Sequence, residues 1–213
     1  MAIRNVAVVG TGAVGAALAK NLVRSGIGVE LSALDMKVAT EIAASLGKGA
    51  KATETKALGE SVDAVFLAVP AEAAPLVLEA AKGLRPGTIV IDCTNPIKWD
   101  AGPVAATPAE GSMTAHLAKK FPSLRLVKGW NTFGAEFHER PELGGGKADL
   151  YYAGDDAAAK GDVGVLARAM GFDPVDVGPL RNAQHLESLA ILWIHMATVG
   201  GRGRDVAFKL LPR

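Results

Sequence analysis

Three glycines near the N-terminus have the spacing that holds a diphosphate. Gly10, Gly12 and Gly15 form a G-x-G-x-x-G pattern. One glycine permits a tight turn, the second lets the backbone approach a pyrophosphate, and the third lets a helix pack on a strand. Free amide groups and the positive end of the helix dipole then bind the anion without a lysine or arginine. The pattern predicts a dinucleotide site made by Gly10, Thr11, Gly12, Ala13, Val14 and Gly15.

The segments on either side of the glycines favour this interpretation over an ordinary glycine-rich turn. Residues 3–9 form a short apolar run, which predicts a strand. Residues 16–23 continue with small and aliphatic side chains at helical spacing, and Ser25 and Gly26 end that helix. A strand that runs through the glycines into a helix is the context that the dinucleotide motif requires.

An acidic residue follows the next predicted strand, residues 29–34. Asp35 lies about 20 positions beyond Gly15, where a carboxylate normally binds the adenosine ribose of NAD. The alternative is that Asp35 only caps the helix predicted over residues 36–46. Lys37 could bind the 2'-phosphate of NADP. The sequence therefore does not decide between NAD and NADP.

Two further strand ends are expected at the same edge of the sheet. Residues 63–69 form a nearly unbroken apolar run, which is typical of a strand buried on both faces. The predicted strand 88–91 ends in the polar turn 92–96, for which plain turn chemistry is the alternative. Ligands of doubly wound folds lie outside the carboxyl ends of the strands. We therefore expect cofactor contacts from Ala68, Val69, Pro70, Asn95 and Pro96.

The turn after the predicted strand 124–128 is the best candidate for the wall that faces the nicotinamide. It contains two glycines, an aromatic residue and two hydrogen-bonding side chains. The turn, residues 129–135, is expected to face the reacting ring, and a packed turn anchored by Trp130 is the alternative. The stretch 98–112 has no clear periodicity and is expected to be a long loop, of the kind that often forms lids.

Composition limits the classes of partner and compartment. The chain has 213 residues, 49% of them hydrophobic and 21% charged, with a net charge of +1, which gives no reason to expect nucleic acid or a membrane surface. The longest apolar stretch, 186–199, is too short to cross a bilayer. A single cysteine favours a reducing, cytoplasmic location. The four histidines are scattered without metal-ligand spacing, are read as surface or helix-face residues, and predict no metal site; His138, near the Asn131 turn, is the one worth testing.

The alternation of strands and helices predicts an α/β fold, with a doubly wound, mainly parallel sheet. Residues 1–135 are interpreted as the dinucleotide-binding domain and 136–213 as a smaller C-terminal part ending in long helices. One such helix is expected to start near Asn182, with an apolar stripe typical of a core or subunit interface. The further elements expected are the helices 71–82, 113–121, 157–170 and 204–211, the strands 148–153 and 174–177, and the stripe Leu186, Leu189, Trp193 and Met196.

Several segments in this order resemble the deazaflavin-dependent NADP reductases, the coenzyme F420-dependent NADP oxidoreductase family of the 6-phosphogluconate-dehydrogenase-like clan. The segments are 10–15, 67–70, 92–96, 127–135, 178–180 and 203–211. The resemblance implies a Rossmann fold, a homodimer, and hydride transfer between NADP and a deazaflavin or flavin. It implies that Asn131, Thr132 and Phe133 line the place where the two rings meet. Family members usually have Ser-Arg or Arg-Arg after the second strand to bind the 2'-phosphate, whereas this chain has Ala33-Leu34-Asp35, so NAD stays an alternative.

Two other functions are open at this stage. A dehydrogenase or imine reductase of the same clan would act on a small metabolite, with Lys128 as proton donor and Asn131 as orienting amide. Hydroxyacid dehydrogenases of that clan carry the lysine and the asparagine four residues apart on a helix, whereas here they are three apart near a strand end. A module that senses NAD(P) without turnover is the other alternative. The small-molecule redox acceptor itself is not indicated by the sequence.

Overall fold

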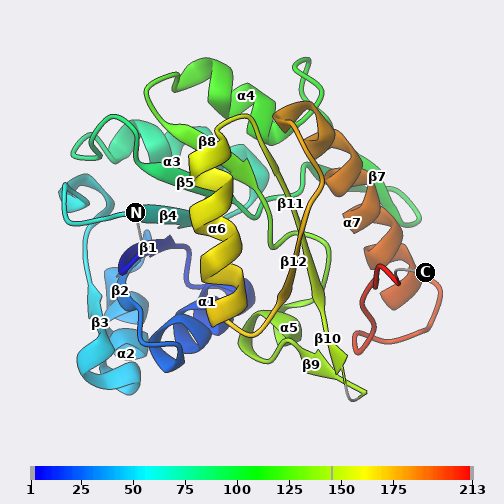
Figure 1. The fold of residues 1–213 in the computed structure, drawn as a ribbon, viewed down its shortest axis with the longest axis horizontal. Helices are drawn as coiled ribbons and strands as arrows, with labels where there is room; N and C mark the ends of the chain where they lie inside the picture. The colour runs from blue at the N-terminus through cyan, green and yellow to red at the C-terminus, as the bar shows by residue number, and fades with distance from the viewer. Residues whose placement is uncertain (1–2, 145, 212–213) are drawn as a thin grey trace.

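A computed structural model of the chain describes residues 3–144 and 146–211. Its centre is an 8-stranded sheet in the order β12-β11-β8-β5-β4-β1-β2-β3 (Figure 1). Neighbouring strands are parallel, except that β11 runs antiparallel to β8. The predicted α/β, mainly parallel fold is therefore confirmed. The strands are β1 (Asn5–Val9), β2 (Gly28–Ser32), β3 (Ala50–Ala52), β4 (Ala64–Leu67), β5 (Ile89–Asp92), β8 (Arg125–Lys128), β11 (Asp149–Gly154) and β12 (Asp173–Asp176).

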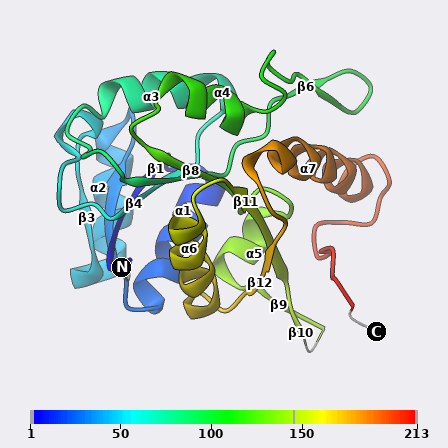
Figure 2. The same cartoon turned by 45° about the horizontal axis from the view of Figure 1, so that its top comes forward.

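Helices cover both faces of the sheet, which is why its central strands are apolar throughout. Along β1, Val6 and Val8 belong to one core cluster, while Ala7 and Val9 belong to the other. This alternation follows from the two-residue period of a strand. Figure 2 shows α3 and α4 on one side of the sheet and α1 and α6 on the other. The helices are α1 (Ala13–Arg24), α2 (Met36–Leu46), α3 (Ala74–Ala80), α4 (Met113–Lys120), α5 (Ala135–Glu139), α6 (Ala157–Ala169) and α7 (Ala183–Ala197).

The expected loop over residues 98–112 is wrong in part, because its start forms a hairpin. β6 (Ile97–Trp99) pairs antiparallel with β7 (Pro103–Ala105). A second hairpin joins β9 (Glu142–Leu143) to β10 (Gly146–Lys147). Short 3-10 turns, η1 to η4, occupy Gly47–Gly49, Thr55–Ala57, Ala71–Ala73 and Leu180–Asn182.

The expected helix over residues 204–211 is also wrong, since this segment has no regular secondary structure. Gly201 and Gly203 just before it adopt left-handed φ angles of 66° and 75°. The Asp149 carboxylate then accepts hydrogen bonds from the Leu210 backbone N–H and from Lys209 Nζ at 2.5 and 2.6 Å. Contacts with β11 thus replace the backbone hydrogen bonds of a helix.

The long C-terminal helix is confirmed as α7, and its apolar stripe packs against the molecule. Leu186 and Trp193 are buried, whereas Leu189 and Met196 are partly buried. The face turned inward also carries a charged residue, Glu187. In the part of the chain that the structure describes, no helix is both long and apolar enough to cross a membrane.

The side chain of Asn21 connects α1, the helix after the glycine turn, with the C-terminal part of the chain. Its side chain is buried in α1, and its Nδ2 donates to the carbonyls of His138 at 2.9 Å and Met170 at 3.0 Å. One amide therefore holds the last turns of α5 and α6 against the side of α1. We refer to these contacts as the Asn21 clasp.

Candidate active site

The glycine turn between β1 and α1 has the geometry that the motif predicts. Gly10 has a φ of +112°, and a Cβ there would lie 2.1 Å from the Ala68 carbonyl oxygen. A Cβ on Gly15 would lie 1.8 Å from the Gly10 carbonyl oxygen. A Cβ on Gly12, in contrast, would meet nothing within 4 Å. The first and third glycines thus serve close packing within the protein, whereas Gly12 faces open space at the N-terminus of α1, where a diphosphate fits.

The turn opens into a cleft of about 490 Å³. This volume lies in the range of small-molecule and cofactor sites. Its described lining contains no lysine, arginine or histidine, so the only side-chain charge in the wall is a carboxylate. Of the predicted cofactor residues, the lining includes Gly10, Thr11, Gly12, Asp35, Ala68, Val69 and Pro70.

Asp35 combines the two roles that the sequence left as alternatives. It is the N-cap of α2, and its Oδ1 accepts a hydrogen bond from the Lys37 backbone N–H at 2.9 Å. It also lines the cleft. The cap fixes the carboxylate in place, so it can meet the ribose hydroxyls without losing side-chain freedom on binding.

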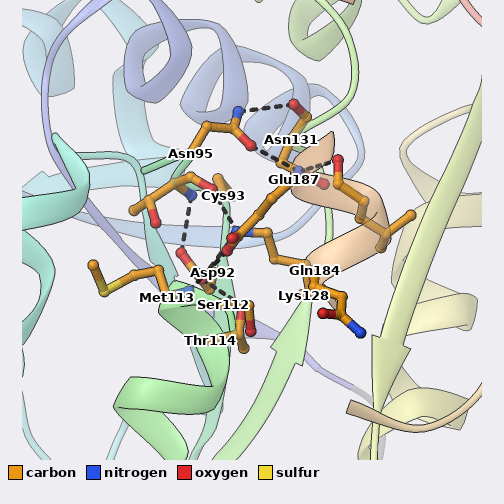
Figure 3. Close-up of polar contacts among 12 residues, drawn as sticks. Asp92, Cys93, Asn95, Ser112, Met113, Thr114, Lys128, Asn131, Gln184 and Glu187 are labelled. Atoms are coloured by element: carbon orange, nitrogen blue, oxygen red, sulfur yellow. Dashed lines mark hydrogen bonds and ion pairs between the residues drawn. The ribbon is translucent and has the colours of Figure 1, made fainter. Parts of the chain in front are cut away.

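The other predicted cofactor residues lie outside the lining of this cleft. Ala13, Val14 and Gly15 form the first turn of α1. Asn95 and Pro96 follow β5. Asn95 Nδ2 donates to the Asn131 carbonyl at 3.0 Å, and Asn131 Nδ2 donates to Asn95 Oδ1 at 2.9 Å (Figure 3). This Asn95–Asn131 pair joins the two polar turns that follow β5 and β8.

The turn after β8 is packed around Trp130. This residue has a left-handed φ of 54°, and its indole is 1% exposed. The ring makes edge contacts with Phe66 and Phe172, with centroids 5.1 and 6.0 Å away. Phe133 stacks on Phe172 at 5.3 Å, and Asn131 and Thr132 are buried as well. The turn is therefore a packed one anchored by Trp130, and the ring-facing role of Asn131, Thr132 and Phe133 stays a prediction.

His138 lies on α5 and is buried against this turn, so the expectation of a surface histidine is wrong for it. The ring is 1% exposed, with Nε2 2.9 Å from the Trp130 carbonyl and Nδ1 3.0 Å from the Gly134 carbonyl. Burial lowers the pKa of His138 to about 4, although both carbonyls oppose the shift. The imidazole is neutral at pH 7, and its single N–H donates to one carbonyl at a time.

A charged cluster that the sequence did not indicate lies at the ends of β5 and β8. Lys128 Nζ contacts Asp92 Oδ2 and Glu187 Oε1, each at 3.1 Å, and it also donates to the Thr94 carbonyl (Figure 3). Lys128 and Asp92 are 0% exposed and Glu187 is 4% exposed. Three acceptors use the three N–H groups of the ammonium. Lys128 is thus enclosed by the protein and has no surface exposed to solvent.

The cluster contains one carboxylate more than it has cations. Asp92 also accepts from the Thr94 backbone N–H at 2.9 Å and from Thr114 Oγ1 at 2.6 Å. Burial raises the pKa of the Glu187 carboxyl, against the effect of Lys128. Asp92 and Lys128 are paired in register at two strand ends, which a strand alignment could have suggested, but nothing in the sequence pairs them with Glu187. Among the described residues, no group of three or more His, Cys, Asp or Glu side chains is placed to hold a metal ion.

Comparison with known proteins finds a family whose model matches the N-terminal part of the chain. Residues 5–96 match the family described as NADP oxidoreductase, coenzyme F420-dependent. The matched residues contain the glycine turn, Asp35 and the polar turn after β5. The recognition made from the sequence is confirmed over these residues.

Solved structures agree over nearly the whole chain. A crystal structure from Arthrobacter sp. FB24, named as a candidate F420-dependent NADP reductase, has a TM-score of 0.87 and 25% identity, and covers 99% of this chain and 100% of its own. A hypothetical protein from Sinorhizobium meliloti has a TM-score of 0.73 and 26% identity over 99% of this chain and 97% of its own. A reductive aminase from Aspergillus terreus in complex with NADPH shares the fold alone, with a TM-score of 0.66 and 18% identity over 94% of this chain and 64% of its own.

Curated relatives are longer than this chain. Metalloreductase STEAP3 of Rattus norvegicus is 30% identical over 186 residues, which are 87% of this chain and 36% of that protein. Metalloreductase STEAP2 of Mus musculus is 27% identical over 188 residues and the same shares of the two chains. The chain thus spans about a third of the length of the curated relatives it matches.

Proposed function

We propose that the protein transfers a hydride between a nicotinamide nucleotide and a flavin-type ring, either a deazaflavin such as coenzyme F420 or a flavin. The observation that carries the proposal is the cleft at the glycine turn. Gly12 leaves room for a pyrophosphate at the N-terminus of α1, and Asp35 stands in the same wall. The amides of the turn would bind the diphosphate, and the Asp35 carboxylate would accept hydrogen bonds from the ribose.

Hydride transfer of this kind suits a site without an exposed proton donor. The nicotinamide supplies the hydride when it is bound, and the protein has to position two rings in near contact. Lys128 is enclosed by Asp92, Glu187 and Thr94. The chain would then contribute the orientation of the two rings and the exclusion of water. The Asn95–Asn131 pair lies at the same edge of the sheet as the glycine turn.

We further propose that NAD is preferred over NADP. A 2'-phosphate carries about −1.5 to −2 charges near neutral pH if it resembles a phosphorylated side chain. The described lining of the cleft has no cation to balance that charge, and its one carboxylate would repel it. The family description names NADP, so this preference would distinguish the chain from its relatives.

The names of the curated relatives add a further class of electron acceptor to the proposal. The curated relatives are named metalloreductases, and the chain covers 36% of their length. We therefore include a ferric chelate beside deazaflavin and flavin among the acceptors to be tested. A dehydrogenase or imine reductase acting on a small metabolite remains the second candidate, supported by the shared fold of the reductive aminase, but the enclosure of Lys128 removes the proton donor that this candidate needed.

The deciding experiment is a titration of the purified protein with NADH and NADPH by nicotinamide fluorescence. Oxidation of the nucleotide is followed at the same time, with coenzyme F420, FMN or a ferric chelate added separately. We expect tight binding of NADH and turnover only when a flavin-type ring is present. Tight binding without turnover by any of these acceptors would favour the NAD(P)-sensing module or a small carbonyl or imine substrate.

The proposal also includes a cytoplasmic homodimer. Exposed apolar side chains lie on the hairpin after β5 and at the end of α7, where Trp99 is 61%, Leu192 50% and Val199 49% exposed. Apolar exposure of this kind is typical of an interaction site. Light scattering on the eluting protein tests the dimer, and a monomeric mass at micromolar concentration would contradict it.

A further inference from the structure

The buried cluster of Asp92, Lys128 and Glu187 lies beside the turn that carries Asn131, and Glu187 connects the two. Glu187 Oε1 accepts from Lys128 Nζ at 3.1 Å and from the Met113 backbone N–H at 2.9 Å. The residue before it on α7, Leu186, uses its carbonyl to accept from Asn131 Nδ2 at 3.1 Å. One turn of α7 therefore holds the strand ends, the start of α4 and the Asn95–Asn131 pair (Figure 3).

We propose that Glu187 is a positioning residue for the turn that carries Asn131, and that it acts as a neutral, hydrogen-bonded acid. The proposal rests on the proposed function only for its kinetic readout. The contacts of its two oxygens are unequal. Oε1 accepts two N–H groups, whereas Oε2 is buried and has no hydrogen-bond partner among the described residues. A proton on Oε2 would displace no existing contact.

The charge balance of the cluster points to the same state. The charged groups facing Glu187 are Lys128 on β8 and Asp92 on β5, and the thiol of Cys93 lies next to Asp92. Two ionised carboxylates with one ammonium would leave an uncompensated negative charge in a region shielded from water, which is costly. Asp92 is the better site for the negative charge, because its oxygens accept from Lys128, Thr94 and Thr114.

The test compares two substitutions of the same residue. Glu187→Gln keeps the shape and places an amide NH2 where a protonated Oε2 would be. We expect the midpoint of thermal unfolding at pH 7 to stay within a few degrees of wild type, and kcat and the nucleotide Kd to stay within about twofold. Glu187→Leu removes the acceptor for Met113 and Lys128. We expect it to lower kcat at least about tenfold while the nucleotide Kd changes less than threefold, since the glycine turn is untouched.

A matched control separates positioning from loss of stability. Leu166 is buried in α6 and has no polar contact with Asp92, Lys128 or Glu187, and Leu166→Ala should lower the unfolding temperature while kcat measured well below that temperature stays near wild type. A comparable loss of kcat in Leu166→Ala and Glu187→Leu would overturn the positioning role. A large loss of stability in Glu187→Gln, equal to that in Asp92→Asn, would show that Glu187 is ionised and would overturn the neutral acid.

A nuclear magnetic resonance measurement makes the test independent of the proposed reaction. The side-chain NH2 resonances of Asn131 report its contacts with Asn95 and Leu186. We expect them to move in Glu187→Leu and to keep their positions in Glu187→Gln. If the wild type shows no turnover, the proposed function fails, but these resonances still decide the role of Glu187. Unchanged resonances in Glu187→Leu would contradict that role.

Discussion

Replacement of Gly12 by alanine should weaken nucleotide binding without unfolding the protein. A Cβ at this position meets no protein atom within 4 Å. The backbone of Gly12, with φ −69° and ψ −175°, is extended and open to any residue. Alanine is a poorer N-cap than glycine but lowers the entropy of the unfolded chain, so the two effects nearly cancel, within about 1 kcal/mol. The unfolding temperature should then change by at most about 4 °C.

The added methyl group would lie where the pyrophosphate has to approach the backbone. Steric overlap of one methyl group in a close-packed site costs about 1–3 kcal/mol, which corresponds to a rise in the nucleotide Kd of roughly 5- to 150-fold. Fluorescence titration with NADH measures this change, and thermal unfolding monitored by circular dichroism measures the stability.

Gly15→Ala is the contrasting variant. Its Cβ would lie 1.8 Å from the Gly10 carbonyl oxygen, a backbone atom that cannot move aside without opening the turn. We expect a loss of about 3 kcal/mol or more, and therefore a fall in unfolding temperature of roughly 6–12 °C. Wild-type nucleotide affinity in Gly12→Ala would refute the position assigned to the diphosphate. Equal destabilisation of the two variants would refute the distinction between open and packed glycines.

Three further predictions concern charged and polar side chains. Asp35→Ser removes the carboxylate from the cleft and should raise the affinity for NADPH relative to NADH by about tenfold in parallel titrations, whereas an unchanged ratio would exclude Asp35 from discrimination. Lys128→Met leaves Asp92 buried without its cation and should cost about 3–5 kcal/mol in urea unfolding, and a neutral result would mean that the cluster is not charged. The pKa of His138 is lowered from 6.5 to about 4, so its contribution to stability is present above pH 6.5 and is lost as the pH falls. The free energy of unfolding should drop by about 3 kcal/mol between pH 6.5 and 4, and a His138→Gln variant should lack this drop; a rise on acidification would mean that the imidazolium donates to both carbonyls.

The sequence was sufficient where local spacing determines structure. Gly10, Gly12 and Gly15 predicted the turn, because their spacing along the chain is that of a strand-to-helix turn in which Gly15 packs on Gly10 and Gly12 is left open. The sequence offered ribose binding and helix capping as alternatives for Asp35, and the structure shows that the residue caps α2 and also lines the cleft, since both places follow from its position between a strand and a helix.

The sequence was insufficient where contacts join distant segments. A helix was expected over residues 204–211, but the Asp149 carboxylate binds Lys209 and the Leu210 backbone instead. Glu187 lies on the inward face of α7 with apolar neighbours, and only the fold brings it to Lys128. Helical periodicity shows which face is buried, but it does not show which buried polar groups meet.

Because of the Asn21 clasp, nucleotide binding at the glycine turn should slow hydrogen exchange in α6, in the C-terminal part of the chain. The N-terminus of α1 faces the cleft, while Asn21 on the same helix binds the carbonyls of His138 and Met170. A ligand that stabilises α1 against local opening therefore also lowers the population of states in which α6 is released. Amide protons of α6 that exchange by such opening should become slower to exchange when NADH is bound, although no atom of that helix lines the cleft. Asn21→Ala would uncouple the two, leaving exchange in α6 insensitive to the nucleotide.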